Sequence, residues 1–158
     1  MSQTVPEIVE LLSAARSTDE QVRREAIVEL VRSGDERGGE LLMEYINGDD
    51  AKLQGVVALA FLELDLSSGL AKTLSKSLWF SIAVNQLVFT YRRSPQGFIR
   101  GENTPEELKI RRVGRALNNE AGMGLMLAAH EEFTKLNEVR GAPRNLEIIW
   151  DGIGEWQG

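Results

Sequence analysis

The sequence contains no cysteine and only one histidine among its 158 residues. Without cysteine the chain forms no disulfide and offers no thiolate to a metal, which favours a reducing compartment, so we predict a cytoplasmic protein. The histidine, His130, is followed four residues later by Thr134, so the paired histidines of a helical zinc-peptidase motif are missing. We therefore predict no metal site and no cofactor. We interpret His130 as a helix histidine hydrogen-bonded to a neighbour, with a catalytic general base as the less favoured alternative.

The sequence also lacks an apolar run long enough to span a membrane. The most apolar stretch, LWFSIAVNQLVFTY, is shorter than the roughly 18 residues a span requires, and Ser81, Asn85 and Gln86 interrupt it. It predicts a buried helix. The N-terminal stretch MSQTVPEIVELLSAAR has no basic region before an apolar one, so it predicts an amphipathic helix rather than an export signal.

Basic charge is scarce overall but is concentrated in one segment. The formal net charge is -6 with a pI near 4.9, which opposes binding of the whole chain to nucleic acid or to an anionic membrane. Residues 1–50 carry twelve acidic and five basic side chains, whereas residues 92–115 carry seven basic and three acidic ones. A local basic surface is therefore expected within an acidic protein.

Helix signals cover most of the chain, and no strand alternation is found. Thr4 with Pro6 predicts a first helix to about Arg16, and Thr18 with Gln21 predicts the cap of a second helix. Gly34 should end that second helix. A third helix should end at Asn47 and Gly48, since both residues tolerate a positive φ. The chain is thus expected to be all-α.

The later part of the chain repeats these signals after one interruption. The stretch 92–103 is rich in glycine and polar residues and predicts a loop. Thr104 then begins a capping box with Pro105 and Glu107, which opens the next helix. Further helices are expected over 105–118, 120–137 and 143–156. Three glycines in this region, Gly114, Gly122 and Gly124, are interpreted as sites of close helix approach.

Two stretches of the chain align with a shift of 31 residues. Asp50 aligns with Asp19, and four apolar positions then match in pairs: Leu53 with Val22, Val57 with Ala26, Ala58 with Ile27, and Phe61 with Leu30. Pairs of helices repeating at this period are typical of an α-solenoid, in which each hairpin buries its apolar face against the next.

The first of these stretches, VRREAIVELVRSGDER, resembles the HEAT-like repeat, in particular the short form of phycobilisome-lyase-type proteins. The matching residues are Val22, Arg23, Ala26, Leu30, Gly34 and Asp35. The second unit departs from the pattern at Gln54 and Leu64, so the resemblance covers about residues 18–78, with a degenerate third unit at 78–92. It implies a short α-solenoid of stacked helical hairpins with a helical C-terminal extension. We expect one domain over 1–158, with repeats over 1–92 and C-terminal helices over 104–158 packed on the stack.

The segment 92–115 is the candidate binding site. A helix beginning at Pro105 places Ile110, Val113, Gly114 and Leu117 in one sector and the basic residues in the remaining arc. The candidate partner-binding residues are Arg92, Arg93, Phe98, Arg100, Lys109, Arg111, Arg112 and Arg115. The alternative is a solvated basic face compensated by the acidic N-terminal helices.

These observations favour a non-catalytic protein–protein interaction module of HEAT-like type, with no catalytic residue assigned. The resemblance implies an alternative, a subunit of a HEAT-like lyase that handles a chromophore. A helical-repeat protein that binds nucleic acid ranks last, because the chain is acidic. A protein partner is expected and no membrane, while the sequence leaves self-association open.

Overall fold

The computed structural model describes residues 4–94, 104–136 and 142–157. Within these ranges every regular element is a helix, which confirms the all-α prediction. No helix in the described ranges is long and apolar enough to cross a membrane. The elements are α1 (Thr4–Ala14), α2 (Glu20–Ser33), η1 (Glu36–Gly38), α3 (Gly39–Ile46), α4 (Ala51–Ala60), η2 (Phe61–Glu63), α5 (Gly69–Thr73), α6 (Lys76–Arg93), α7 (Pro105–Ala121), α8 (Met123–Leu136) and α9 (Ala142–Ile149), where η denotes a 3-10 helix.

The chain divides into two compact units, residues 1–79 and 80–158. The division falls inside α6, the helix that the sequence assigned to a degenerate third repeat. The expectation of one domain over 1–158, with repeats to residue 92, stays a prediction.

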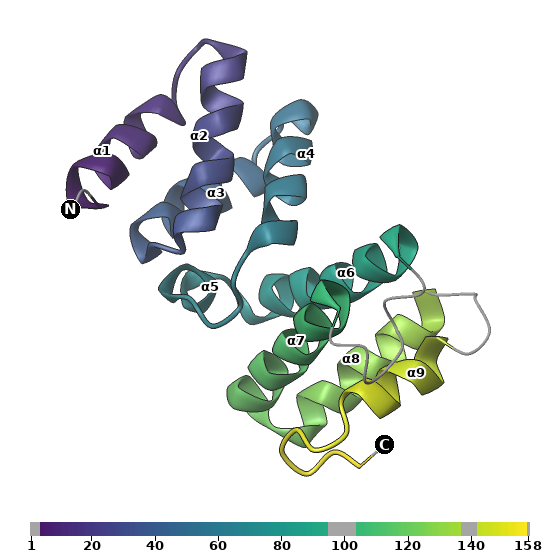
Figure 1. Ribbon diagram of the computed structural model, residues 1–158. Coiled ribbons are helices and arrows are strands. Elements are labelled where there is room, and N and C mark those ends of the chain that lie inside the picture. The colour runs from purple at the N-terminus through teal and green to yellow at the C-terminus, as the bar shows by residue number, and fades with distance from the viewer. Residues whose placement is uncertain (1–3, 95–103, 137–141, 158) are drawn as a thin grey trace. The chain divides into compact units, whose positions relative to one another are not determined.

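In the first unit, α2 lies between α1 and α4 (Figure 1). Its N-cap is Asp19, whose carboxylate accepts hydrogen bonds from the backbone N–H groups of Gln21 (3.0 Å) and Val22 (3.2 Å). The sequence placed this cap one residue too early, at Thr18, because it did not weigh the stronger carboxylate acceptor beside it. The helix ends at Gly34 with a φ of 67°, as predicted.

A later helix of the unit, α4, begins in the same way as α2. Asp50 is its N-cap and accepts a hydrogen bond from the N–H of Leu53 at 3.1 Å, so aspartates 31 residues apart begin both helices. In two of the matched apolar pairs, Ala26 with Val57 and Leu30 with Phe61, both residues are buried, although Phe61 lies in η2 just after α4. The other pairs differ: Val22 is 42% exposed, and Ala58 is exposed although Ile27 is fully buried.

The second helices of the two hairpins, α3 and α5, also pack on each other. The helix α3 ends before Asn47, where the sequence predicted its end, but not for the predicted reason. Asn47 has a φ of -89° and Gly48 is not among the residues with positive φ, so this turn uses no left-handed residue. The predicted cap of α1 at Thr4 depends on side chains outside the described part of the chain.

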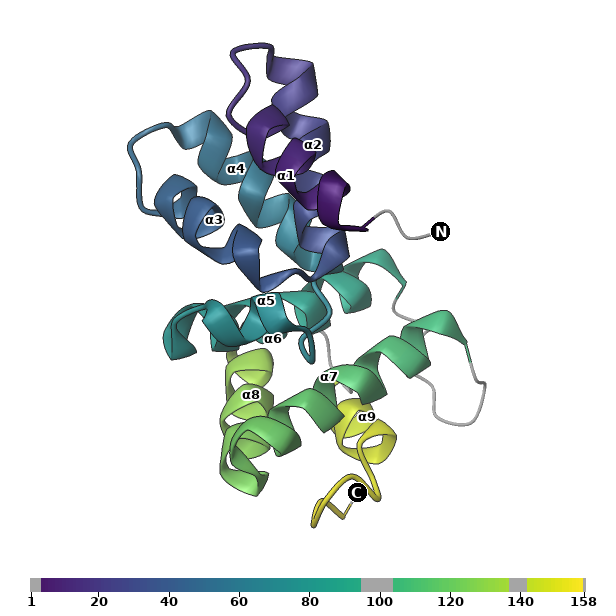
Figure 2. The same cartoon turned by 90° about the vertical axis from the view of Figure 1, so that its left-hand side faces the viewer.

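In the second unit, α7 lies against α8 and α9 (Figure 2). The predicted inner face of α7 is confirmed, since Ile110, Val113, Gly114 and Leu117 are buried. Thr104 caps the helix as predicted, with its hydroxyl accepting from the N–H of Glu107 at 3.1 Å. From α6, the ring of Tyr91 meets Phe133 of α8 edge to face, with ring centroids 6.4 Å apart.

The core of this unit is built around Trp150, which is fully buried. Its indole N–H donates to the carbonyl oxygen of Ile110 at 2.9 Å, and its ring stands 5.2 Å from that of Trp156. Gly114 permits this contact, because a Cβ added there would lie 2.5 Å from the indole nitrogen. The prediction of close approach is therefore confirmed at Gly114.

The prediction of close helix approach is wrong at Gly122 and Gly124, where an added Cβ would meet no atom within 4 Å. Gly122 instead ends α7 with a φ of 73°. The predicted helix over 143–156 is also too long, since α9 ends at Ile149. Gly152 and Gly154 have φ values of 90° and 56°, which turn the chain back on itself.

Candidate partner-binding surface

The outward side of α7 carries a stripe of exposed residues, which we call the α7 outer face. Its members follow helical spacing on the side opposite Ile110, Val113 and Leu117. They are Pro105, Leu108, Arg112, Arg115 and Asn119. Neither an Asp nor a Glu belongs to this stripe, so the two arginines are not compensated along it.

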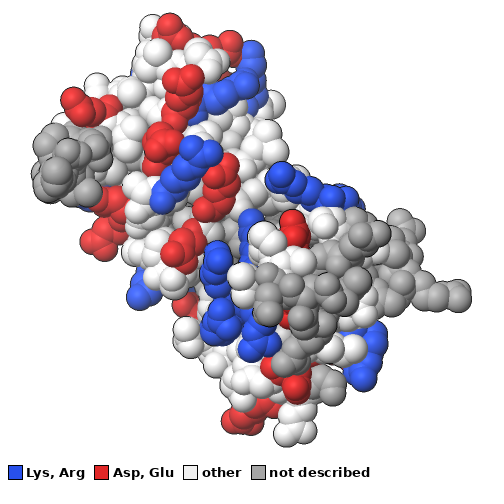
Figure 3. All heavy atoms as spheres, viewed as in Figure 1, with Lys and Arg blue, Asp and Glu red and all other residues white. Residues whose placement is uncertain are grey.

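Leu108 gives the N-terminal part of the α7 outer face an apolar group. Its side chain is 42% exposed, and helical spacing sets it on the same side of α7 as Arg112 and Arg115, which follow it by one and about two turns. Lys and Arg side chains gather over α7 in the view of Figure 3. An exposed leucine followed by two arginines on the same side of a helix suits a partner that offers both an apolar and an anionic group.

A hollow of about 130 Å³ lies between the end of α6 and the first turns of α7. It brings together two of the predicted residues, Arg93 and Lys109, beside the half-exposed ring of Phe89. Glu106 also lines it, so the hollow carries charge of both signs.

Arg111 does not belong to the exposed surface. Its guanidinium donates to the carbonyl oxygens of Ile149 (2.5 Å) and Asp151 (3.2 Å), the orphan acceptors at the end of α9. Position 111 lies on the flank of α7 that faces α9, which the division into one apolar and one basic arc overlooked. Arg111 therefore holds α9 on α7.

The other predicted residues have separate positions. Arg92 is exposed near the end of α6, and Arg112 and Arg115 are exposed on α7. Phe98 and Arg100 lie outside the described residues. Leu108 was not predicted, although the helical spacing that placed Arg112 and Arg115 on one side of the helix also placed Leu108 there.

His130 joins α8 to α9. Its Nε2 atom lies 3.1 Å from the carbonyl oxygen of Pro143 and 3.0 Å from the carboxylate of Glu147, and its ring stands 5.7 Å from Trp156. Glu147 also accepts from Arg144 at 2.9 Å. The interpretation of His130 as a hydrogen-bonded helix histidine is confirmed.

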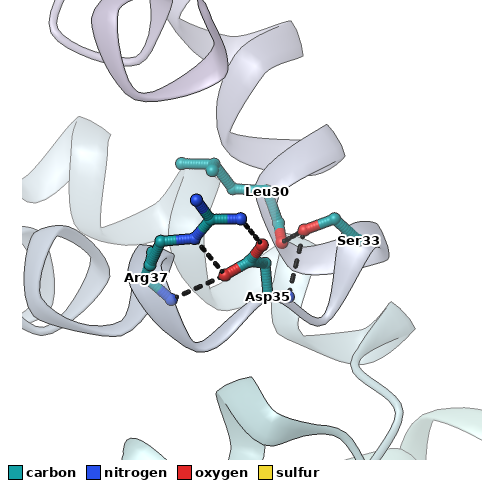
Figure 4. A network of polar contacts seen from close by, with 4 residues as sticks. All are labelled: Leu30, Ser33, Asp35 and Arg37. Carbon is teal, nitrogen blue, oxygen red and sulfur yellow. Dashed lines mark hydrogen bonds and ion pairs between the residues drawn. The ribbon is translucent and has the colours of Figure 1, made fainter. Parts of the chain in front are cut away.

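The Gly-Asp pair of the repeat motif makes a turn rather than a binding site (Figure 4). The carboxylate of Asp35 accepts from the backbone N–H of Arg37 at 2.9 Å and from its guanidinium at 3.0 and 2.6 Å. Ser33 donates to the carbonyl of Leu30 and accepts from the N–H of Asp35. The guanidinium of Arg37, and then its backbone N–H, hold the pKa of Asp35 below its usual value of 3.8.

Within the described ranges, no group of three or more acidic, histidine or cysteine side chains is placed to hold a metal ion. Comparison of the chain with family models, curated proteins and solved structures gave no match.

Proposed function

We propose that the chain is a non-catalytic protein-binding module of HEAT-like type that recognises an acidic segment of a partner protein. The observation that carries this proposal is the α7 outer face, where Leu108 is exposed on the same side of the helix as Arg112, one turn later, and Arg115, about two turns later. Such a face fits an amphipathic partner segment whose apolar side chain covers Leu108 while carboxylates meet the guanidinium groups.

The charge balance of the two units supports an acidic partner. Residues 1–79 hold 8 basic and 14 acidic side chains, a formal charge of -6 (8 − 14), whereas residues 80–158 hold 10 of each. The unit that carries the α7 outer face is therefore neutral as a whole, and four of its ten basic residues lie on α7. A local basic patch on a neutral unit attracts anionic groups at short range, within about one Debye length of ~8 Å at physiological salt.

Packing in the first unit supports the HEAT-like part of the proposal. First helices pack on first helices (α2 on α4) and second helices on second helices (α3 on α5). Arg32 and Glu63, which are 31 residues apart, form an ion pair at 2.7 Å between the two hairpins. An interaction between residues one period apart is what stacked repeats produce.

The chemistry of the polar groups supports a non-catalytic role. In the second unit, His130 is the only histidine of the chain, and Arg111 is a half-buried cation. Both are engaged in joining α9 to its neighbours. Their contacts account for their positions without a substrate.

The experiment compares the proteins captured by three forms of the full chain from lysate of its source. The variant R112E/R115E reverses the charge of the α7 outer face and leaves Arg111 in place on α9. The matched control is R24E, which reverses an exposed arginine in the first unit. We expect a protein that binds the wild type and R24E but not R112E/R115E, with binding that weakens as salt is raised.

A second variant, L108E, separates the apolar contact from the charge. It should reduce binding at least tenfold, because loss of a buried leucine contact and burial of a carboxylate both oppose association. Equal capture by all forms, with circular dichroism showing that each is folded, would overturn the proposal.

A further inference from the structure

The α7 outer face presents one apolar group and two cationic groups in a fixed order along the helix. Leu108 comes first, Arg112 follows it by one turn and Arg115 by about two turns. With a rise of about 1.5 Å per residue, the two arginines start about 6 Å and about 10 Å beyond Leu108. Within the described part of the chain, neither guanidinium forms a hydrogen bond or an ion pair. The order and spacing of these groups therefore decide which partner segment fits them.

A helical segment fits this spacing better than an extended one. In a second helix, side chains three, four and seven residues apart share one face and follow the same rise as α7. In an extended segment, the side chains of one face are about 7 Å and about 13 Å apart, which overshoots Arg115. Every regular element in the described ranges is a helix, so no sheet edge is present there to pair with the backbone of an extended segment. A helix satisfies its own backbone groups and needs no such edge.

The helix dipole favours one orientation of such a partner. Acidic side chains are most favourable in the first turn of a helix, where they compensate the positive end of the dipole. Arg112 and Arg115 lie on the C-terminal side of Leu108, so a partner that begins with acidic residues meets them only if it runs antiparallel to α7. In a parallel pair, the carboxylates would lie toward the C-terminus of the partner, where the dipole opposes them.

We propose that the α7 outer face binds an acidic helix that runs antiparallel to α7, an inference that rests on the function proposed above. From its N-terminus this helix has the order E-x-x-E-x-x-x-L, in which Asp can replace Glu and another large apolar residue can replace Leu. Its first carboxylate meets Arg115, its second meets Arg112, and its apolar side chain covers Leu108. Contact at all three positions requires a shallow crossing of the helices, near the class of about 20°. Spacing and order thus define the partner more narrowly than charge alone.

The first test uses peptides as probes with the full chain. The matching peptide has the core EAAEAAAL, and the control has the same composition in the order EALAEAAA, each within an alanine-based helix of about 16 residues with blocked ends. In the control, the leucine points away from the face that carries the two glutamates. Fluorescence anisotropy should show that the wild type binds the matching peptide at least tenfold more tightly than the control. Equal binding of the two peptides would exclude recognition by spacing.

An exchange of charge tests which groups meet. R112E/R115E should bind the matching peptide at least tenfold more weakly than the wild type does, and should prefer a peptide with the core KAAKAAAL. R24E, which alters an exposed arginine of the first unit, should bind the matching peptide as the wild type does. Loss of binding in R24E, or no preference of R112E/R115E for the lysine peptide, would show that the peptide binds elsewhere.

The orientation can be measured with a nitroxide label, because a chain without cysteine offers a single introduced thiol as the only attachment point. The label is placed either at N119C, near the C-terminal end of the α7 outer face, or at P105C, at its N-terminal end. In nuclear magnetic resonance spectra of the bound peptide, the label at N119C should broaden the N-terminal residues of the peptide and the label at P105C its C-terminal residues. The opposite pattern would overturn the antiparallel orientation.

The peptide experiments are separable from the capture of a partner from lysate. If R112E/R115E loses its partner in lysate but the wild type binds no matching peptide, the acidic antiparallel helix is wrong and the proposed function stands. If all forms capture the same proteins from lysate, the proposed function fails and the acidic helix fails with it.

Discussion

The polar contacts that join the helices differ between the first unit and the second. In the first unit, exposed ion pairs such as Arg32 with Glu63 and Arg16 with Glu44 connect neighbouring elements, and the Tyr45 hydroxyl donates to the carbonyl oxygen of Ala15 at 2.7 Å. In the second unit, two buried indoles donate to backbone carbonyls, Trp150 to Ile110 and Trp156 to Glu147. Exposed ion pairs contribute little to stability, whereas a buried indole contributes both packing and a satisfied hydrogen bond. Loss of one of these indoles should therefore destabilise the chain more than loss of one of these ion pairs.

The largest effect is expected for W150A. Removing this fully buried side chain leaves a cavity against Gly114 and loses the hydrogen bond to the Ile110 carbonyl, which should lower the free energy of unfolding by about 3–5 kcal/mol. Urea denaturation followed by circular dichroism measures the change. The control W150F keeps most of the apolar volume and loses the indole N–H, so it should be destabilised by less. Equal effects in both variants would mean that packing contributes little at this position.

The prominence of Trp150 shows what the sequence could predict and what it could not. Helical spacing placed Leu146, Ile149, Trp150 and Ile153 on one apolar face, and all four are buried. The spacing did not reveal that α9 ends at Ile149, because Gly152 and Gly154 adopt positive φ values that depend on the tertiary turn. Local patterns determine which residues are apolar and inward, while turns between elements depend on contacts far away in sequence.

The same limit of prediction from sequence applies to the residues of the candidate binding surface. Arg112 and Arg115 could be found from spacing alone, because only their own helix determines that they point outward. The role of Arg111 could not, since its partners at Ile149 and Asp151 are 38 and 40 residues further along the chain. A charge on the flank of a helix is exposed or engaged according to which helix packs beside it.

A second prediction compares one glycine from each unit. Gly34 and Gly122 both end a helix with positive φ, but a Cβ at Gly34 would lie 2.8 Å from the Cβ of Ser68, whereas one at Gly122 would meet nothing within 4 Å. G34A should cost about 1–2 kcal/mol from its left-handed backbone and more from the contact with Ser68. G122A should cost about 1–3 kcal/mol from backbone strain alone, because its ψ of -157° lies in a region that only glycine readily adopts. Thermal denaturation of the two variants measures both costs. A cost for G34A of no more than about 1–2 kcal/mol would show that α5, which follows Ser68, shifts to relieve the contact.

A third prediction tests whether the two hairpins of the first unit are equivalent. Asp19 and Asp50 cap α2 and α4 through the same kind of bond, from carboxylate to free backbone N–H. D19A and D50A should each cost about 1 kcal/mol in free energy of unfolding, and the costs should add in the double variant because the caps share no partner. A matched control is D49A, which alters the neighbour of Asp50 and not the cap itself. A cost at Asp50 well below that at Asp19 would count against equivalent repeats.

The smallest effect is a dependence on pH at Asp35. Because Arg37 holds the pKa of this carboxyl below 3.8 in the folded chain, the ionised form stabilises the fold above that pH. The contribution is lost as the pH falls from 3.8 through the lower folded value. The difference in free energy of unfolding between wild type and D35N should therefore be constant at neutral pH and shrink below 3.8. In R37M the guanidinium is gone while the backbone N–H still meets the carboxylate, so the folded pKa should lie closer to 3.8 and the shrinkage should be smaller without vanishing. Both carboxylate bonds lie within one turn between α2 and α3, so a difference that persists unchanged in acid would mean that Asp35 acts through the shape of the turn rather than through its charge.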